Sequence, residues 1–136
     1  LYVVGFGNGY KNEDDLKNKE KKDKYRYLVK MDINNTNKPK LLSYMASNEK
    51  GSGFYGLTVN NNIVYILSNN SNKLYLIKSE GDKFSYLTNV DITDLTMFDD
   101  INIFIKDKTL YIPNYSESGD LVTVDINDTN NPSVTK

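Results

Sequence analysis

A twelve-residue segment that occurs twice constrains the fold of this chain more than any other feature. The sequence LVKMDINNTNKP at residues 28–39 returns as LVTVDINDTNNP at residues 121–132, and eight of the twelve positions are identical. A degenerate third copy, LYLIK, occupies residues 74–78, so the unit recurs after 46 and then 47 residues. This period falls within the range of about 40–50 residues typical of propeller blades. The chain is therefore predicted to be a repeat protein.

Other parts of the unit keep the same phase. The segments in question are LYVV at 1–4, VYIL at 64–67 and LYIP at 110–113. Short apolar runs alternate with turn-forming residues, which predicts strands. No series of apolar residues at helical spacing is long enough to predict a helix instead. The middle unit predicts strands at 55–59, 63–67, 73–78 and 84–90. The last unit predicts strands at 101–105, 109–112, 121–126 and 133–136.

Turn chemistry separates these strands. Asparagine-rich segments at 60–62 and 69–72 tolerate a left-handed backbone, and Gly81 with its neighbour supplies the third reversal. Asp32 and Asp125 end the third strand of their units, where Asn and Thr side chains cap a tight turn and the following proline restarts an extended chain. The duplicated segment is thus predicted to connect one strand to the next.

These residues resemble the LVIVD repeat, whose units have a tyrosine-bearing strand, a loop and then the pattern LVIVDISDPxNP. The match is close at 28–39 and at 121–132, which follows a tyrosine-bearing LYI. In the middle unit, Lys78 stands where the pattern has aspartate, and Ser85 stands where it has proline. The resemblance implies a β-propeller, often of a bacterial surface or exported protein, and it implies no activity.

The expected fold class is all-β, with about three four-stranded antiparallel blades forming a partial β-propeller over residues 1–136. The units span approximately residues 1–45, 54–90 and 98–136. Propellers typically close with about four to eight blades, so three blades leave edges able to pair with other chains. We therefore expect the chain to be part of a larger ring. Either further blades of a longer protein or a second copy, supplying six blades in all, would close it.

Residues 11–24 interrupt the repeat between the second and third strands of the first unit, and eleven of these fourteen residues are charged. Acidic residues precede basic ones at i,i+4 spacing, which allows a short solvated helix. Leu16 is its one large apolar residue, so the segment has no face to bury. A charged loop is predicted, and docking of a partner on that loop is the functional alternative.

The composition excludes most catalytic chemistry. The chain has no histidine and no cysteine, so a Ser-His triad, a thiol nucleophile, an imidazole base and an ordinary zinc site are impossible. Its 17 basic and 18 acidic residues give a net charge of -1, which favours neither nucleic acid nor an anionic membrane as a partner. No run approaches the ~18 apolar residues of a membrane span. We expect no catalytic residue, no cofactor and no metal site.

Six residues are candidates for a binding face: Tyr10, Phe54, Tyr55, Asp99, Asp100 and Tyr115. The two aspartates lie on the connector to the first strand of the last unit, which is nearest the axis of a propeller. There they would face a central ligand or a hard cation, and a solvated connector is the alternative. The four aromatic residues lie in or beside loops that share one face of a propeller. Exposed aromatics there would stack on a sugar or anchor a protein, and ordinary packing is the alternative.

Three other tyrosines, Tyr2, Tyr65 and Tyr111, recur with the repeat. They are predicted to pack between neighbouring blades, with the hydroxyl reaching the edge. The function expected is a non-catalytic module that binds a protein or a small polar ligand, in an exported or cell-surface bacterial protein. The alternative is a fragment of a propeller enzyme of the hydrolase class, with its catalytic residues outside this chain.

Overall fold

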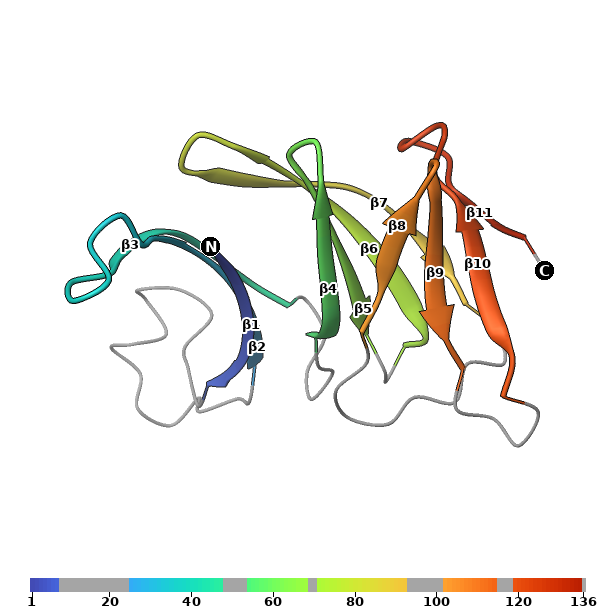
Figure 1. The fold of residues 1–136 in the computed structure, drawn as a ribbon, viewed down its shortest axis with the longest axis horizontal. Coiled ribbons are helices and arrows are strands. Elements are labelled where there is room, and N and C mark those ends of the chain that lie inside the picture. The colour runs from blue at the N-terminus through green and yellow to red at the C-terminus, as the bar shows by residue number, and fades with distance from the viewer. Residues whose placement is uncertain (8–24, 48–53, 69–70, 93–101, 115–118, 136) are drawn as a thin grey trace.

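The computed structural model describes residues 1–7, 25–47, 54–68, 71–92, 102–114 and 119–135. These residues form eleven β-strands in three antiparallel sheets (Figure 1). The described part of the chain is all-β, as the sequence predicts. It accordingly contains no helix that could cross a membrane.

Each sheet is built from strands that are consecutive in the sequence, so each is an antiparallel meander. The first sheet has three strands: β1 (Tyr2–Gly7), β2 (Tyr25–Asp32) and β3 (Lys40–Ala46). The second has four: β4 (Phe54–Asn60), β5 (Ile63–Ser68), β6 (Lys73–Glu80) and β7 (Lys83–Asp91). The third also has four: β8 (Phe104–Lys106), β9 (Thr109–Pro113), β10 (Leu121–Asp125) and β11 (Ser133–Thr135).

The strands predicted for the middle unit are confirmed, each within two residues of its expected ends. The last unit differs at its first strand, which was expected at 101–105 and runs from Phe104 to Lys106. Asn102 and Ile103 precede this strand, and Ile103 is buried. The first sheet has, among the described residues, no strand equivalent to β4 or β8.

The two-residue turns that join β4 to β5 and β8 to β9 have the same conformation. Asn61 and Asn62 have φ of 47° and 64°, and their counterparts Asp107 and Lys108 have φ of 48° and 63°. Two successive positive φ values define the type I′ turn, whose twist matches that of the flanking strands. The turn predicted at the asparagines is thus confirmed, and it recurs in the following unit.

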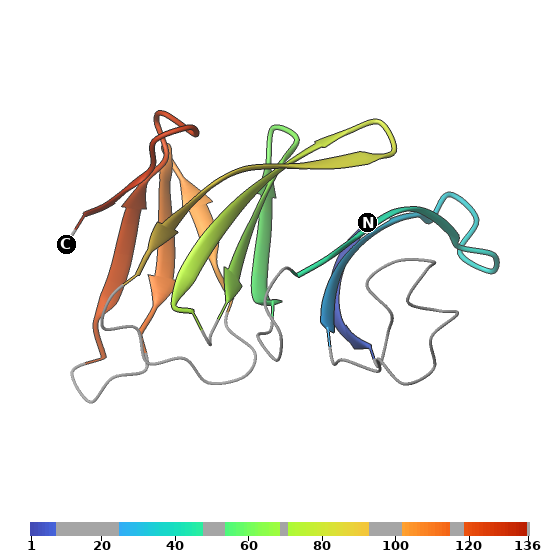
Figure 2. The ribbon, with the colours of Figure 1, turned by 180° about the vertical axis from the view of Figure 1, so that it is seen from behind.

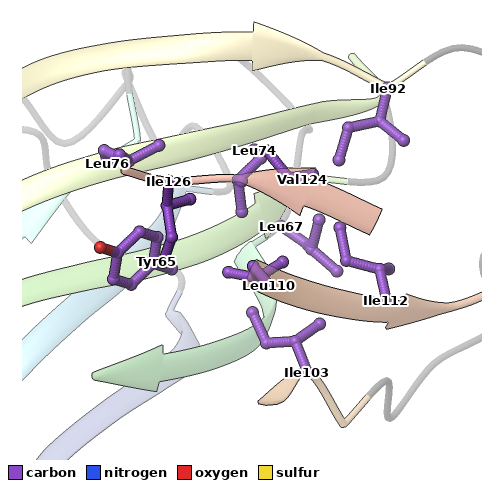
Figure 3. Packing of buried hydrophobic residues seen from close by; sticks show 10 residues of the cluster. All are labelled: Tyr65, Leu67, Leu74, Leu76, Ile92, Ile103, Leu110, Ile112, Val124 and Ile126. Carbon is purple, nitrogen blue, oxygen red and sulfur yellow. The ribbon is translucent and has the colours of Figure 1, made fainter. Parts of the chain in front are cut away.

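The apolar core lies on both sides of the second sheet. Val64 and Ile66 of β5 pack in a cluster with Leu28 of the first sheet. The alternate residues, Tyr65 and Leu67, pack in a second cluster with side chains of the third sheet (Figure 3). Because successive side chains of a strand point to opposite faces, β5 buries one set of residues against each neighbouring sheet.

The three sheets consequently stand in a row with the second in the middle (Figures 1 and 2). Contacts between sheets run from β1 and β2 to β4, from β3 to β7 and from β4 to β8. The three sheets do not close into a ring. What the structure shows is an open stack of small antiparallel sheets.

The position of β5 predicts a large difference between two leucine substitutions. Leu67 is 0% exposed, and its truncation in Leu67→Ala leaves a cavity between two sheets. We expect the free energy of unfolding to fall by about 2–5 kcal/mol. Leu41→Ala is the matched control, since Leu41 is 54% exposed and a change there costs within about 0.5 kcal/mol. Urea unfolding followed by circular dichroism measures both, and equal losses would contradict the stacking.

Candidate functional site

Four of the six predicted binding residues, Tyr10, Asp99, Asp100 and Tyr115, lie outside the described residues. The same is true of the charged segment at 11–24. The other two, Phe54 and Tyr55, are neighbours at the start of β4. The structure therefore places only these two.

Phe54 is a packing residue in this structure. It is 5% exposed, and its ring meets that of Tyr75 edge-on with centroids 6.1 Å apart. It belongs to the cluster between the first and second sheets. Tyr55 is only partly buried. The packing alternative considered for Phe54 is thus favoured, and Tyr55 is left as the candidate binding residue of this pair.

A cluster of polar side chains that the sequence did not single out joins the first sheet to the second. Tyr2 donates a hydrogen bond from its hydroxyl to Ser79 Oγ over 3.1 Å. Lys30 Nζ donates to the same oxygen over 3.3 Å and to the carbonyl oxygen of Gly81 over 2.7 Å. The ammonium also lies 5.7 Å from the centre of the Tyr2 ring, within reach of a cation–π attraction. We call Tyr2, Lys30, Ser79 and Gly81 the lysine cluster.

The lysine cluster has the composition of a serine nucleophile beside an amine base, but its geometry is that of a structural contact. Ser79 is 2% exposed, so a substrate carbonyl has no path to its hydroxyl. Tyr2 and Lys30 both donate to the Ser79 oxygen and so satisfy the acceptor of a buried hydroxyl. The cluster therefore holds two sheets together rather than presenting a reactive group.

The equivalent positions between the second and third sheets are apolar. Tyr65 corresponds to Tyr2 by the repeat, and it packs with Leu76 and Ile126, the counterparts of Lys30 and Ser79 (Figure 3). Tyr65 is 1% exposed, and no hydrogen bond to its hydroxyl is found within the described part of the chain. Burial raises the pKa of this hydroxyl above its ordinary value. Packing between sheets is thus confirmed for both tyrosines, but the hydroxyl of Tyr65 is buried and does not reach an edge.

The third tyrosine of the repeat lies on an exposed face. Tyr111 stacks on Phe104 of the neighbouring strand, with centroids 5.0 Å apart and planes 8° from parallel. The pairing continues across the third sheet to Thr123 and Thr135, whose hydroxyls are 3.0 Å apart. We call these four residues the tyrosine row of the third sheet. Phe104 is 51% exposed, so this row presents a stacked aromatic pair to solvent.

The aspartates that end the third strands act in turns. Asp32 Oδ1 accepts a hydrogen bond from the backbone N–H of Asn34 over 2.9 Å, and Asp125 Oδ1 accepts one from that of Asn127 over 2.8 Å. These bonds form Asx turns. A tight turn is confirmed here, but at these two positions the aspartate caps the backbone rather than the predicted Asn or Thr. No group of three or more Asp or Glu side chains that could hold a metal ion occurs in the described ranges.

Comparison with models of protein families, with curated proteins and with solved structures finds no match to this chain. The resemblance to the LVIVD repeat thus stays a prediction from the sequence. What the structure establishes is an all-β chain of three small antiparallel sheets.

Removing one hydroxyl from each of two equivalent tyrosines is expected to have different effects. Tyr2→Phe loses the hydrogen bond to Ser79, and we expect it to lower the free energy of unfolding by about 0.5–1.5 kcal/mol. Tyr65→Phe removes a buried hydroxyl that has no partner among the described residues, so it is expected to be neutral or stabilising. Urea unfolding at pH 7 compares the two variants. A larger loss in Tyr65→Phe than in Tyr2→Phe would contradict the assignment.

The same tyrosine predicts a loss of stability at alkaline pH. Because burial raises the pKa of Tyr65, the unfolded chain loses this proton from about pH 10 upward while the folded chain keeps it. The folded state then binds more protons, so its stability falls as the pH rises. The stability that the folded state has while Tyr65 is protonated in both states is therefore fully present below about pH 10. The difference between the wild type and Tyr65→Phe should be constant at neutral pH and should shift in favour of the variant above about pH 10. An unchanged difference in urea unfolding there would refute it.

Proposed function

We propose that this chain is a non-catalytic β-propeller-type repeat module that binds a protein or a small polar ligand, as part of an exported or cell-surface bacterial protein. In this proposal the three sheets are successive blades of the LVIVD kind. The observation that carries it is the second sheet, which is covered on both faces by sheets built from the same repeat positions. Blades are sheets of this kind, which need a neighbour on either side.

The residues of the chain support binding rather than catalysis. Histidine and cysteine are absent from the whole sequence, and Ser79 is buried in the lysine cluster. Eleven tyrosines and five phenylalanines supply the side-chain types that most often anchor partners. A tyrosine combines an apolar ring with a polar hydroxyl, so it suits both a protein surface and a sugar.

The proposed binding face consists of connectors rather than strands. In a propeller, loops between second and third strands and the segments that lead to first strands share one face. Tyr10 and Tyr115 belong to loops of the first kind, and Tyr55 lies at the start of a first strand. Asp99 and Asp100 would add polar groups near the axis of the same face. Phe54, the neighbour of Tyr55 on β4, is buried between the first and second sheets and is not part of this face.

Substitution of the two aromatic residues tests this face. Tyr55→Ala and Tyr115→Ala are each expected to weaken binding about tenfold or more, because an aromatic anchor at the centre of an interface carries about 2 kcal/mol or more. The immobilised chain is first screened against a glycan array and against surface-protein extracts of bacteria. Each ligand found is then titrated against the wild type and the variants.

Tyr86→Ala is the matched control, since Tyr86 is a 48% exposed tyrosine on β7, away from the proposed face. It should bind as the wild type does, and circular dichroism should show that all three variants are folded. Equal binding by all of them would argue against the face. Turnover of a captured ligand would favour the alternative, a hydrolase whose remaining residues lie outside this chain.

A further inference from the structure

Both copies of the duplicated segment contain the same acceptor motif for a covalent modification. Residues 32–36 read DINNT and residues 125–129 read DINDT, so each copy has an asparagine followed two positions later by a threonine. Asn-x-Thr, with any residue except proline in the middle, is the acceptor tripeptide of N-linked glycosylation. The acceptor residues are Asn34 and Asn127. Each has an aspartate two positions before it.

This aspartate distinguishes the two acceptors from others in the chain. Bacterial enzymes that transfer N-linked oligosaccharides also select an acidic residue two positions before the asparagine, a carboxylate that a cationic group of the enzyme can bind. Tripeptides of the form Asn-x-Ser or Asn-x-Thr begin at four residues: Asn34, Asn69, Asn114 and Asn127. The two outside the duplicated segment have leucine or isoleucine at the earlier position. The longer motif therefore occurs only in the duplicated segment.

The motif is also a departure from the LVIVD pattern that the segment resembles. Where that pattern has DISDP, this chain has asparagine in place of the serine and threonine in place of the proline, in both copies. The two substituted positions are the acceptor and the threonine of the tripeptide. A sequence that followed the pattern would have no acceptor here.

The hydrogen bonds of the turn show which of these positions the fold uses. Besides the aspartate, the turn uses the residue after the acceptor. Asn35 Oδ1 accepts from the backbone N–H of Asn37 over 3.1 Å, and Asp128 Oδ1 accepts the equivalent bond over 2.9 Å. Neither Thr36 nor Thr129 has a hydrogen-bond partner for its hydroxyl within the described ranges. The turn therefore does not account for the two threonines.

The acceptor side chains differ in how freely their amide nitrogen can react. Asn34 and Asn127 are both exposed. The carboxamide of Asn34 has no partner in the part of the chain that the structure describes. By contrast, Asn127 Nδ2 donates to Asp125 Oδ1 over 2.8 Å. Because Nδ2 is the atom that glycosylation modifies, Asn127 must first give up a hydrogen bond and Asn34 need not.

We propose that Asn34 and Asn127 are N-glycosylation sites of this protein. In the reaction, Nδ2 attacks the anomeric carbon of an oligosaccharide carried on a lipid pyrophosphate. The bond between that carbon and the pyrophosphate oxygen breaks, and the lipid pyrophosphate leaves with the electron pair. One Nδ2 proton passes to a base of the transferase. The chain meets this enzyme only after export, so the inference rests on the export that is part of the proposed function.

The glycans would stand at the end of the sheets opposite the proposed binding face. In an antiparallel meander, successive connectors alternate between the two ends of the strands. The two turns connect third strands to fourth strands, over residues 33–39 and 126–132 (Figure 1, cyan and red). The connectors between second and third strands, which contribute to the proposed binding face, lie at the other end. A bulky and solubilising glycan thus leaves that face open.

Glycan transfer to the purified, folded chain tests the sites. The chain is incubated with a bacterial oligosaccharyltransferase and a lipid-linked oligosaccharide, and tandem mass spectrometry locates the glycan. We expect it on Asn34 and Asn127 and not on Asn69 or Asn114, which serve as internal controls. Asn34 should react about two- to tenfold faster than Asn127, because no hydrogen bond has to break. An unmodified Asn34, or equal modification of all four residues, would overturn the proposal.

Variants separate the motif from the turn. Thr36→Ala should abolish transfer to Asn34 and leave the urea midpoint unchanged, since the hydroxyl has no partner in the described ranges. Thr36→Ser should restore transfer. Asp32→Asn keeps an oxygen that can cap the turn but loses the charge, so transfer to Asn34 should fall about tenfold or more. Asn127 in the same molecules is the matched control and should react as before. Persistent transfer to Asn34 in Thr36→Ala would refute the assignment.

The transfer assay can fail independently of the proposed function. It requires neither export nor a binding partner, so an unmodified chain would overturn the glycosylation sites alone. The glycan array and the extract screen use the unmodified chain, and a failure there would count against the binding face alone.

Discussion

One strand, β5, is buried on both of its faces, and the stacking of the sheets depends on it. Every residue of β5 after Ile63 is buried, with Val64 and Ile66 on one side and Tyr65 and Leu67 on the other. Burying such side chains is worth roughly 1.5–3 kcal/mol each, and both neighbouring sheets contribute to that burial. An isolated sheet of this size would expose the apolar side chains of β5 to water on both faces, which is unfavourable. The stability of the chain therefore lies in the contacts between sheets.

The two contacts between sheets use the same repeat positions but different residue types. The first contact is polar at these positions and the second is apolar, which favours the observed order of the sheets. Lys30 finds two oxygen acceptors on the second sheet, at Ser79 and Gly81. Facing Ile126 instead, its ammonium would lose the Ser79 hydroxyl as an acceptor. Leu76 at the equivalent position meets the apolar face of the third sheet without this loss. This difference favours the observed order of the sheets.

The strands were predictable from the sequence because their signals are local. Alternating apolar residues and the turn at Asn61 and Asn62 mark β4 and β5 within a few residues. The lysine cluster had no such signal, because Lys30 and Ser79 are 49 residues apart and meet only when two sheets stack. Phe54 shows the same limit, since an aromatic residue beside a loop is equally suited to a surface or to the core. The candidate site was therefore less predictable than the fold.

The connectors between strands differ in how much their length can vary. The turns at 61–62 and 107–108 have the same length and conformation, because they must keep two strands in register. The connectors between the second and third strands span residues 8–24, 69–72 and 114–120, and so differ widely in length. Strand positions are held by packing, and a change there costs stability. Loops of variable length change at little cost to stability. Selection for binding would therefore act on this set of connectors, while Tyr2 and Tyr65 are kept by the need to stack.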